Sequence, residues 1–269
     1  MVLFESVLLG IIQGFTEFLP VSSSAHLILI PWIFGWEGTL VDSLSFDVAL
    51  HAGTLVAILV YFWRDWLLLL RKFFSSLHDG SWKSGEGRFV WYIVLATIPA
   101  GILGFKFEHI VEQSFRNPLL IVVALAVISI VMWIVDRYSS KMVNIQHMRL
   151  GHALFIGCAQ AVALIPGVSR SGITIIAGLM SGYTRESAAR FSFLLATPVI
   201  FGAAVLKLAK LHLGTGEAVP FLLGTISSAI IGYVSIKFLL RYLNSHSLNL
   251  FVGYRLALAA AVLALVIIR

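Results

Sequence analysis

Long apolar runs dominate the pattern of hydrophobic and polar positions along this chain. An α-helix needs roughly 20 predominantly apolar residues to cross a bilayer, and six runs are close to that length. The pattern therefore predicts six spanning helices, at residues 44–63, 91–106, 118–135, 187–206, 219–240 and 249–268. Two of them, 91–106 and 118–135, are short for a hydrocarbon core about 30 Å thick and need help from flanking residues.

Two further apolar regions, 1–35 and 150–181, are interrupted by polar residues near their middles. Proline followed by serines stops one helix and can cap the next. We therefore expect each region to form a re-entrant helix–loop–helix hairpin that enters and leaves on one side. Such a broken backbone is tolerated at membrane depth only where it faces protein or a wet cavity. The interruptions are Pro20 with Ser22–Ser24, and Pro166-Gly167 with Ser169–Ser171.

The two interrupted regions also resemble each other at an offset of 147 residues, and a second echo at offset 128 aligns 95–105 with 223–233. Each half then holds one hairpin and three spans, an odd number, so the halves are inverted relative to each other. The expected fold is an all-α integral membrane protein with an inverted-topology repeat, approximately 1–135 and 150–269. One membrane domain covers 1–269, and the hairpin tips meet near the midplane. The matched pairs are Gly10 and Gly157, Gln13 and Gln160, Ser22 and Ser169, Ser24 and Ser171, Phe46 and Phe193, and Ala49 and Ala196.

Composition supports the membrane assignment and excludes a soluble domain. Hydrophobic residues make up 59% of the chain and charged residues 12%, against about 25% charged in a typical soluble domain. The basic excess, 19 Lys and Arg against 13 acidic residues, indicates membrane topology rather than nucleic-acid binding. If residues 64–90 are cytoplasmic, most basic residues lie inside and both termini lie outside. The stretch 73–88 is the clearest polar linker, and no basic segment precedes the first apolar run, so we expect no cleavable signal peptide.

The first hairpin carries residues suited to acid–base or metal chemistry. Gln13 and Glu17 are four positions apart and share a helix face, one turn before the break. The serine run Ser22–Ser24 starts the next helix, and His26 lies in its first turn. A carboxylate is expensive to bury in a membrane, so Glu17 is a candidate functional group.

The second hairpin carries an arginine at a helix start, which is typical of an anion site. Arg170 offers five donors in a fixed geometry that suits a phosphate or diphosphate. The expected anion-binding group also includes Ser169, Ser171, Gly172 and Thr174. Several alternatives stay open: Arg170 as the counter-ion of Glu17, and Ser22 and Ser169 as plain helix caps. Asp47 and His51, also four apart, either line the cavity or pair with each other. Arg185, Glu186 and Arg190 are expected to form a local ion pair where a helix begins.

These motifs resemble those of the undecaprenyl-diphosphatase family, the membrane phosphatases of the bacitracin-resistance type. The resemblance spans nearly the whole chain and rests on QGFTEFLPVSSSAH (13–26), PGVSRSGIT (166–174) and RESAARFSFLLATP (185–198). It implies removal of the terminal phosphate of undecaprenyl diphosphate, giving the monophosphate that carries cell-wall precursors. It also implies a divalent cation, Mg²⁺ or Ca²⁺, and a multi-pass location in the plasma (inner) membrane with the site opening to the extracytoplasmic side.

Carried over position by position, the resemblance places catalytic roles on Glu17, Ser23, His26 and Arg170, with Glu17 also as the metal ligand. The residues expected to bind substrate are Gln13, Ser22, Ser24, Ser169, Ser171, Gly172 and Thr174. Two positions depart from the family pattern. Gln13 stands where a second carboxylate is common, and Ala25 stands where many members have glycine. The expected partners are a polyprenyl diphosphate lipid and the membrane, with no nucleic acid, and a homo-oligomer is compatible with the sequence.

The sequence leaves the nucleophile open. Ser23 attacks with His26 or Glu17 as its base, or one of these two activates a water molecule directly. We favour Ser23 with His26 as its acid–base partner. A different class of protein is the main alternative, because inverted repeats with broken helices are also the architecture of secondary transporters. A lipid-phosphate flippase or an anion transporter would equally need a buried arginine.

Overall fold

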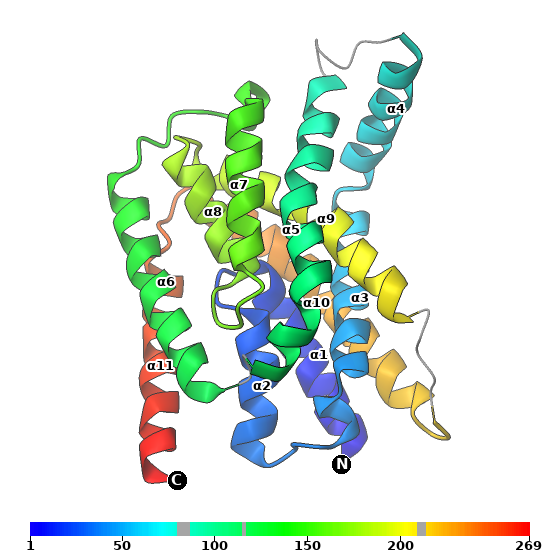
Figure 1. The fold of residues 1–269 in the computed structure, drawn as a ribbon, viewed down its shortest axis with the longest axis vertical. Coiled ribbons are helices and arrows are strands. Elements are labelled where there is room, and N and C mark those ends of the chain that lie inside the picture. Colours follow the sequence, from blue (N-terminus) through cyan, green and yellow to red (C-terminus); the bar gives the residue numbers. More distant parts are fainter. Residues whose placement is uncertain (80–86, 115–116, 209–213) are drawn as a thin grey trace.

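The computed structural model describes residues 1–79, 87–114, 117–208 and 214–269, and within them the chain is helical (Figure 1). The two ends of the chain lie at the same end of the molecule. The α-helices are α1 (Val2–Phe18), α2 (Ser23–Phe34), α3 (Leu44–Tyr61), α4 (Trp63–Asp79), α5 (Gly87–Ser114), α6 (Pro118–Tyr138), α7 (Leu150–Val162), α8 (Arg170–Met180), α9 (Arg185–Leu208), α10 (Ala218–Leu243) and α11 (Asn249–Ile268).

Six of these helices are long and apolar enough to cross a membrane, which confirms the six predicted spans. They are α3, α5, α6, α9, α10 and α11. The boundaries of α5 were predicted poorly, because α5 has 28 residues where the apolar run alone indicated 91–106. Polar residues at both ends of that run continue the helix, so α5 is not a short span. Pro99 lies inside α5, as proline often does in membrane helices.

The expectation that 73–88 is a polar linker was wrong for its first part, where α4 continues to Asp79. Polarity alone was misleading there, because the apolar residues of α4 recur at helical spacing along one exposed side. Residues 80–86 lie outside the described part of the chain. The exposed apolar residues of this side are Trp63, Leu67, Leu70, Phe74 and Leu77.

The two interrupted apolar regions fold as predicted into pairs of short helices. α1 and α2 are separated at 19–22, and α7 and α8 at 163–169. The loop between α7 and α8 descends towards the loop between α1 and α2 (Figure 1). Ser171 Oγ donates to the carbonyl oxygen of Leu19 at 3.2 Å, so the two loops are in direct contact.

Each hairpin packs tightly against a helix from the other half of the chain. A Cβ atom at Gly10 of α1 would lie 2.4 Å from the carbonyl oxygen of Gly224 in α10. A Cβ atom at Gly157 of α7 would lie 2.1 Å from the carbonyl oxygen of Ala96 in α5. Only glycine fits at these positions, and the close backbone approach is typical of helix packing in membranes.

Candidate active site

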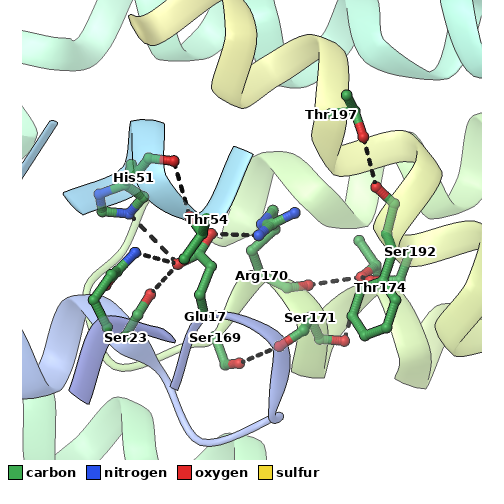
Figure 2. A network of polar contacts seen from close by, with 12 residues as sticks. Glu17, Ser23, His51, Thr54, Ser169, Arg170, Ser171, Thr174, Ser192 and Thr197 are labelled. Atoms are coloured by element: carbon green, nitrogen blue, oxygen red, sulfur yellow. Dashed lines mark hydrogen bonds and ion pairs between the residues drawn. The ribbon is translucent and has the colours of Figure 1, made fainter. Parts of the chain in front are cut away.

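The carboxylate of Glu17, in the last turn of α1, lies at the centre of a polar cluster inside the protein (Figure 2). The residue is 5% exposed. Its Oε2 atom accepts hydrogen bonds from Gln13 Nε2 at 3.0 Å and from Ser23 Oγ at 2.6 Å. Its Oε1 atom accepts one from Arg170 Nη2. The shared helix face of Gln13 and Glu17 is thereby confirmed.

Ser23 reaches Glu17 because the chain reverses sharply just before α2. Ser22, the N-cap residue, has a φ of 79°, in the left-handed region that non-glycine residues seldom adopt. Holding a residue there costs on the order of 1–3 kcal/mol, and such strain is concentrated at functional sites. The Ser22 side chain does not cap the helix; its Oγ lies 3.3 Å from Ser24 Oγ. The first serine and the third therefore contact each other, and only the second joins the Glu17 cluster.

Arg170 is the first residue of α8, and its ion pair with Glu17 joins the two hairpins (Figure 2). The counter-ion role that the sequence left open is therefore formed. The arginine side chain is 14% exposed, and its Nη1 atom is buried without a hydrogen-bond partner among the described residues. A buried guanidinium nitrogen without a partner is costly, and a phosphate oxygen is a suitable acceptor for it.

The remaining residues of the second hairpin form the start of α8. Ser169 has a φ of 74°, and its Oγ caps the helix by accepting from Gly172 N at 3.1 Å. Ser169 Oγ and Ser171 Oγ are 3.2 Å apart. Thr174 Oγ1 donates to the carbonyl oxygen of Arg170 at 2.7 Å and lies 2.6 Å from Ser192 Oγ. These hydroxyls therefore stabilise the first turn of α8. Thr174 points towards Ser192 of α9 rather than towards Glu17.

A second buried arginine, Arg255 of α11, binds the backbone of both hairpin loops. It is fully buried. Its guanidinium donates to the carbonyl oxygens of Pro20 (3.4 Å), Gly167 (2.8 Å) and Val168 (3.4 Å). No role was predicted for this residue from the sequence, although an arginine within an apolar run of a membrane protein indicates a functional or structural site.

His26 was expected to be the partner of Ser23, but the structure directs its ring elsewhere. His26 Nδ1 lies 2.7 Å from the carbonyl oxygen of Ser22, and Nε2 lies 2.7 Å from Tyr254 Oη. Because a carbonyl only accepts, Nδ1 carries a proton, and the basic lone pair of the neutral ring is on Nε2. The ring also stacks on that of Tyr254, with the centroids 5.7 Å apart. Its two nitrogens therefore have other partners than Ser23 and Glu17.

His51 occupies the place beside Glu17 that His26 was expected to fill (Figure 2). Its Nε2 atom lies 3.5 Å from Glu17 Oε2, and its side chain is 31% exposed. Its Nδ1 atom lies 2.7 Å from the carbonyl oxygen of Asp47, one turn earlier on α3. The sequence left open whether Asp47 and His51 line the site or pair with each other. In the structure His51 lines the site, and its contact with Asp47 is to the backbone carbonyl oxygen, which orients the ring.

The residues around Glu17 offer a small but suitable donor set for a divalent cation. Gln13 Oε1 is buried without a hydrogen-bond partner among the described residues, and the nitrogen of the same amide donates to Glu17 Oε2. Amide and carboxylate oxygens are ligands that Mg²⁺ and Ca²⁺ accept, and Mg²⁺ often takes few protein ligands together with substrate phosphates. Among the described residues, three or more His, Cys, Asp or Glu do not come together as a metal-binding group. Gln13 and Glu17 are therefore the candidate donors for a divalent cation.

Comparison with known proteins matches residues 6–261 to the family described as bacitracin resistance protein BacA. The chain belongs to the BacA family. The matched residues include five of the apolar spans in full and the last span up to position 261. The Glu17 cluster therefore lies wholly within the match.

Individual BacA relatives match over almost their full length. The protein of Desulforudis audaxviator is 48% identical over 266 residues, covering 99% of this chain and 98% of that protein. The protein of Moorella thermoacetica is 46% identical over 269 residues, covering 100% of both. The protein of Thermodesulfovibrio yellowstonii is 48% identical, covering 99% of this chain and 98% of that protein. All three carry the name undecaprenyl-diphosphatase.

Within this BacA chain, the structure brings four of the expected residues together and leaves others apart. Gln13, Glu17, Ser23 and Arg170 form one connected group. Other expected residues do not join this group but form hydrogen bonds within the first turn of α8, which begins at Arg170. These are Ser169, Ser171, Gly172 and Thr174. His26 belongs to a neighbouring contact with Tyr254.

Proposed function

We propose that this chain is an undecaprenyl-diphosphatase, which hydrolyses the terminal phosphate of undecaprenyl diphosphate to give undecaprenyl phosphate for cell-wall precursor synthesis. The observation that carries the proposal is the contact of Ser23 Oγ with Glu17 Oε2, at 2.6 Å, beside the guanidinium of Arg170. A nucleophile, a base beside it and a fixed positive charge are groups that promote phosphoryl transfer, because they position the attacking oxygen and stabilise the charge of the transferred group. The names of the full-length relatives support the substrate.

In the proposed reaction, Ser23 is the nucleophile and Glu17 is its base. Ser23 Oγ bonds to the terminal phosphorus, its proton passes to Glu17 Oε2, and the bond from that phosphorus to the bridging oxygen breaks. Undecaprenyl phosphate is the leaving group. Glu17 gives its proton to the departing phosphate group. In the second step Glu17 accepts a proton from water while the water oxygen bonds to phosphorus and the bond from Ser23 Oγ to phosphorus breaks. Glu17 returns that proton to Ser23 Oγ, so phosphate is released and both side chains are restored. We assign the base to Glu17 rather than His26 because both ring nitrogens of His26 have other partners.

Arg170 stabilises the charge on the transferred phosphoryl group. In the structure its Nη2 atom binds Glu17, while its Nη1 atom has no hydrogen-bond partner among the described residues. Nη1 is therefore the donor assigned to a phosphate oxygen. Such preorganised charge is often the largest single contribution to catalysis, because the donor does not need to reorient during the reaction.

Gln13 Oε1 and the carboxylate of Glu17 are the groups that would hold a divalent cation, Mg²⁺ or Ca²⁺. When bound, such an ion supplies further neutralisation of the diphosphate. Gln13 also donates to Glu17, so the same side chain orients the base.

The proposed architecture is one membrane domain with two re-entrant hairpins in an inverted repeat. Two correspondences support it. Ser22 and Ser169, related by the offset of 147 residues, share the rare positive φ. The offset of 147 residues relates Gly10 to Gly157, and the offset of 128 relates Ala96 to Gly224. The contact of Gly10 with Gly224 is therefore equivalent to that of Gly157 with Ala96. Equivalent contacts between opposite halves are expected when the halves are related by a two-fold axis.

We propose that both termini lie on the extracytoplasmic side of the plasma (inner) membrane, because the distribution of basic residues favours that orientation. The site is proposed to open to the same side, as the resemblance to the family implies. A cysteine at Glu37, in the exposed loop after α2, tests the orientation in a Cys158→Ser background. It should react with a membrane-impermeant maleimide added to intact spheroplasts. Labelling only after lysis would reverse the assigned orientation.

The activity is tested with the purified protein in detergent, by measuring phosphate released from undecaprenyl diphosphate with Mg²⁺, with Ca²⁺ or with a chelator. We expect metal-dependent release that is lost in Glu17→Ala and Arg170→Ala. A pure lipid carrier would release no phosphate and would instead move the lipid between leaflets of a vesicle. Absence of release under every condition, from protein that remains folded, would overturn the proposed function.

A further inference from the structure

We propose that a cavity between α4, α5 and α9 binds the phosphate headgroup of an anionic glycerophospholipid, whose acyl chains lie along the exposed apolar side of α4. The cavity has a volume of about 830 Å³. Sites for small molecules typically have volumes of roughly 300–1,000 Å³. The inference goes beyond the proposed function, because the described residues that line the cavity are separate from the Glu17 cluster.

Among the described residues that line the cavity, basic side chains outnumber acidic ones. Lys72 of α4, Arg88 of α5 and Arg190 of α9 contribute positive charge, and the carboxylates are those of Asp65 and Glu186. The three basic residues come from three different helices, so they surround the cavity rather than follow one helix. A basic cavity between the helices of a membrane protein is typical of a site for an anionic lipid headgroup.

Arg190 gives the cavity a guanidinium in a fixed position. Its Nη2 atom donates to Asp65 Oδ1 at 2.5 Å, and the guanidinium lies over the ring of Phe62, 5.4 Å from the ring centroid. The Arg190 side chain is nevertheless 36% exposed. One carboxylate oxygen and one ring face do not use all five N–H donors of a guanidinium, so a phosphate oxygen can bind to the others.

The cavity wall is held together by contacts between elements that are distant in the sequence. Trp91 Nε1 of α5 donates to Ser76 Oγ of α4 at 3.0 Å. Ser187 Oγ of α9 accepts from Ile145 N at 3.1 Å, which attaches the segment 144–148 to α9. Each of these segments contributes residues to the lining, so the cavity belongs to the packed fold.

The exposed apolar side of α4 favours a lipid over free phosphate. α4 lies at the end of the molecule opposite the two chain termini (Figure 1), and it is not one of the six helices apolar enough to cross a membrane. A helix with one apolar and one charged side lies in the membrane interface, with its apolar side towards the acyl chains. The apolar residues recur at spacings of four and three, and these are Trp63, Leu67, Leu70, Phe74 and Leu77.

The cavity and the apolar side of α4 are adjacent. Leu68 and Leu69 line the cavity, and they lie between Leu67 and Leu70 of the apolar side. A lipid headgroup in the cavity therefore places its chains beside α4, whereas inorganic phosphate makes no use of that surface. Under the orientation proposed above, this end of the molecule faces the cytoplasmic leaflet, whose anionic lipids attract basic residues.

Binding is measured by native mass spectrometry on the purified protein in a non-ionic detergent. The probes are dioleoyl phosphatidylglycerol, dioleoyl phosphatidylcholine and inorganic phosphate; the two lipids have the same acyl chains and differ in headgroup charge. We expect phosphatidylglycerol to bind on the order of 10-fold more tightly than phosphatidylcholine. A photoreactive phosphatidylglycerol should crosslink to α4 and to other residues of the cavity wall.

Two double variants separate the headgroup from the acyl chains. Lys72→Gln with Arg88→Gln should weaken phosphatidylglycerol binding on the order of 10-fold, because two positive charges are removed from the cavity wall. Leu67→Ser with Phe74→Ser should weaken it through the loss of apolar contact with the chains. The matched control is Lys237→Gln with Arg241→Gln, at exposed positions near the end of α10, which removes the same charge and should bind as wild type does.

The Tm of each variant in lipid-free detergent identifies any folding defect, and the crosslinking of the wild type needs no variant. Equal binding of the two lipids, or crosslinks spread over all the spans, would overturn the inference. So would wild-type affinity for phosphatidylglycerol in a folded Lys72→Gln, Arg88→Gln protein. If Leu67→Ser with Phe74→Ser had no effect and inorganic phosphate competed with the lipid, the cavity would be a site for a free anion and the lipid assignment would be wrong.

Discussion

Arg255 Nη2 donates to the carbonyl oxygen of Gly167 at 2.8 Å, and Nη1 of the same guanidinium donates to the carbonyl oxygen of Pro20. Arg255 belongs to α11 and is fully buried. One side chain therefore binds the loops of both hairpins. Its Nε atom donates to Ser129 Oγ at 2.9 Å, which anchors the guanidinium to α6. The relative position of Glu17 and Arg170 depends on these two loops, since each residue is close to one of them.

Replacing Arg255 with methionine should lower both stability and activity. The substitution keeps much of the side-chain volume but leaves the loop carbonyls without their donor, at about 1–3 kcal/mol for each buried group. We expect a lower Tm in detergent and a marked loss of phosphate release. Arg137→Met, at an exposed arginine near the end of α6, is the matched control and should change neither. An unaltered Tm in Arg255→Met would show that the loops hold their positions without it.

Ser23→Ala should abolish turnover if the serine is the nucleophile. We expect a loss on the order of 10³-fold or more, as for other nucleophiles that act as part of a unit. Phosphate release at saturating substrate measures it, and Ser245→Ala in the exposed loop after α10 is the control. Near-wild-type turnover in Ser23→Ala, with Glu17→Ala and His26→Ala inactive, would exclude the serine route in favour of an activated water.

The sequence predicted the local features of this site well. The breaks around Pro20 and Pro166, the start of α2 at Ser23 and the start of α8 at Arg170 all follow from residues close together in the chain. The shared face of Gln13 and Glu17 also follows from helical spacing. Such features need only the backbone preferences of a few neighbouring residues.

Contacts between distant residues were the main source of error. Arg185 and Arg190 were expected to pair locally with Glu186. Instead, Arg185 binds Asp136 at 2.6 Å and Arg190 binds Asp65 at 2.5 Å, so these charges join α9 to α6 and to α4. The directions of the His26 and His51 rings were likewise not predicted, because a histidine ring can point in several directions from the same helix. Ring direction depends on partners such as Tyr254, 228 positions away, which spacing does not reveal.

Tyr254→Phe should weaken the orientation of His26 without emptying the space that the ring fills. The phenol oxygen lies 2.7 Å from His26 Nε2, and a net hydrogen bond of this kind stabilises by about 0.5–1.5 kcal/mol. We expect a small decrease in Tm and a decrease of a few-fold in kcat. The exposed Tyr138→Phe, at the end of α6, is the control. If Tyr254→Phe matched wild type in both measurements, this hydrogen bond would have no role in the reaction.

The ion pair between Glu17 and Arg170 should show strong coupling in a double-mutant cycle of stability. Glu17→Gln alone leaves the guanidinium of Arg170 buried without its counter-ion. Arg170→Met alone leaves the carboxylate of Glu17 buried without its counter-ion. Removing one partner of a buried ion pair lowers the free energy of unfolding by about 3–5 kcal/mol. The double variant removes both charges. It should therefore be destabilised by clearly less than the sum of the two single variants, although all three should be inactive because each lacks a group that acts on the phosphate.

Denaturant or thermal unfolding in one detergent measures the cycle, and added diphosphate extends it. If Arg170 turns from Glu17 to a phosphate, the ligand should stabilise the wild type and Glu17→Gln but not Arg170→Met. The pair Arg185 and Asp136 provides a control cycle outside the site, where coupling is expected without any effect of the ligand. Additive single and double variants at Glu17 and Arg170 would mean that the two hairpins are held together by the loop contacts alone.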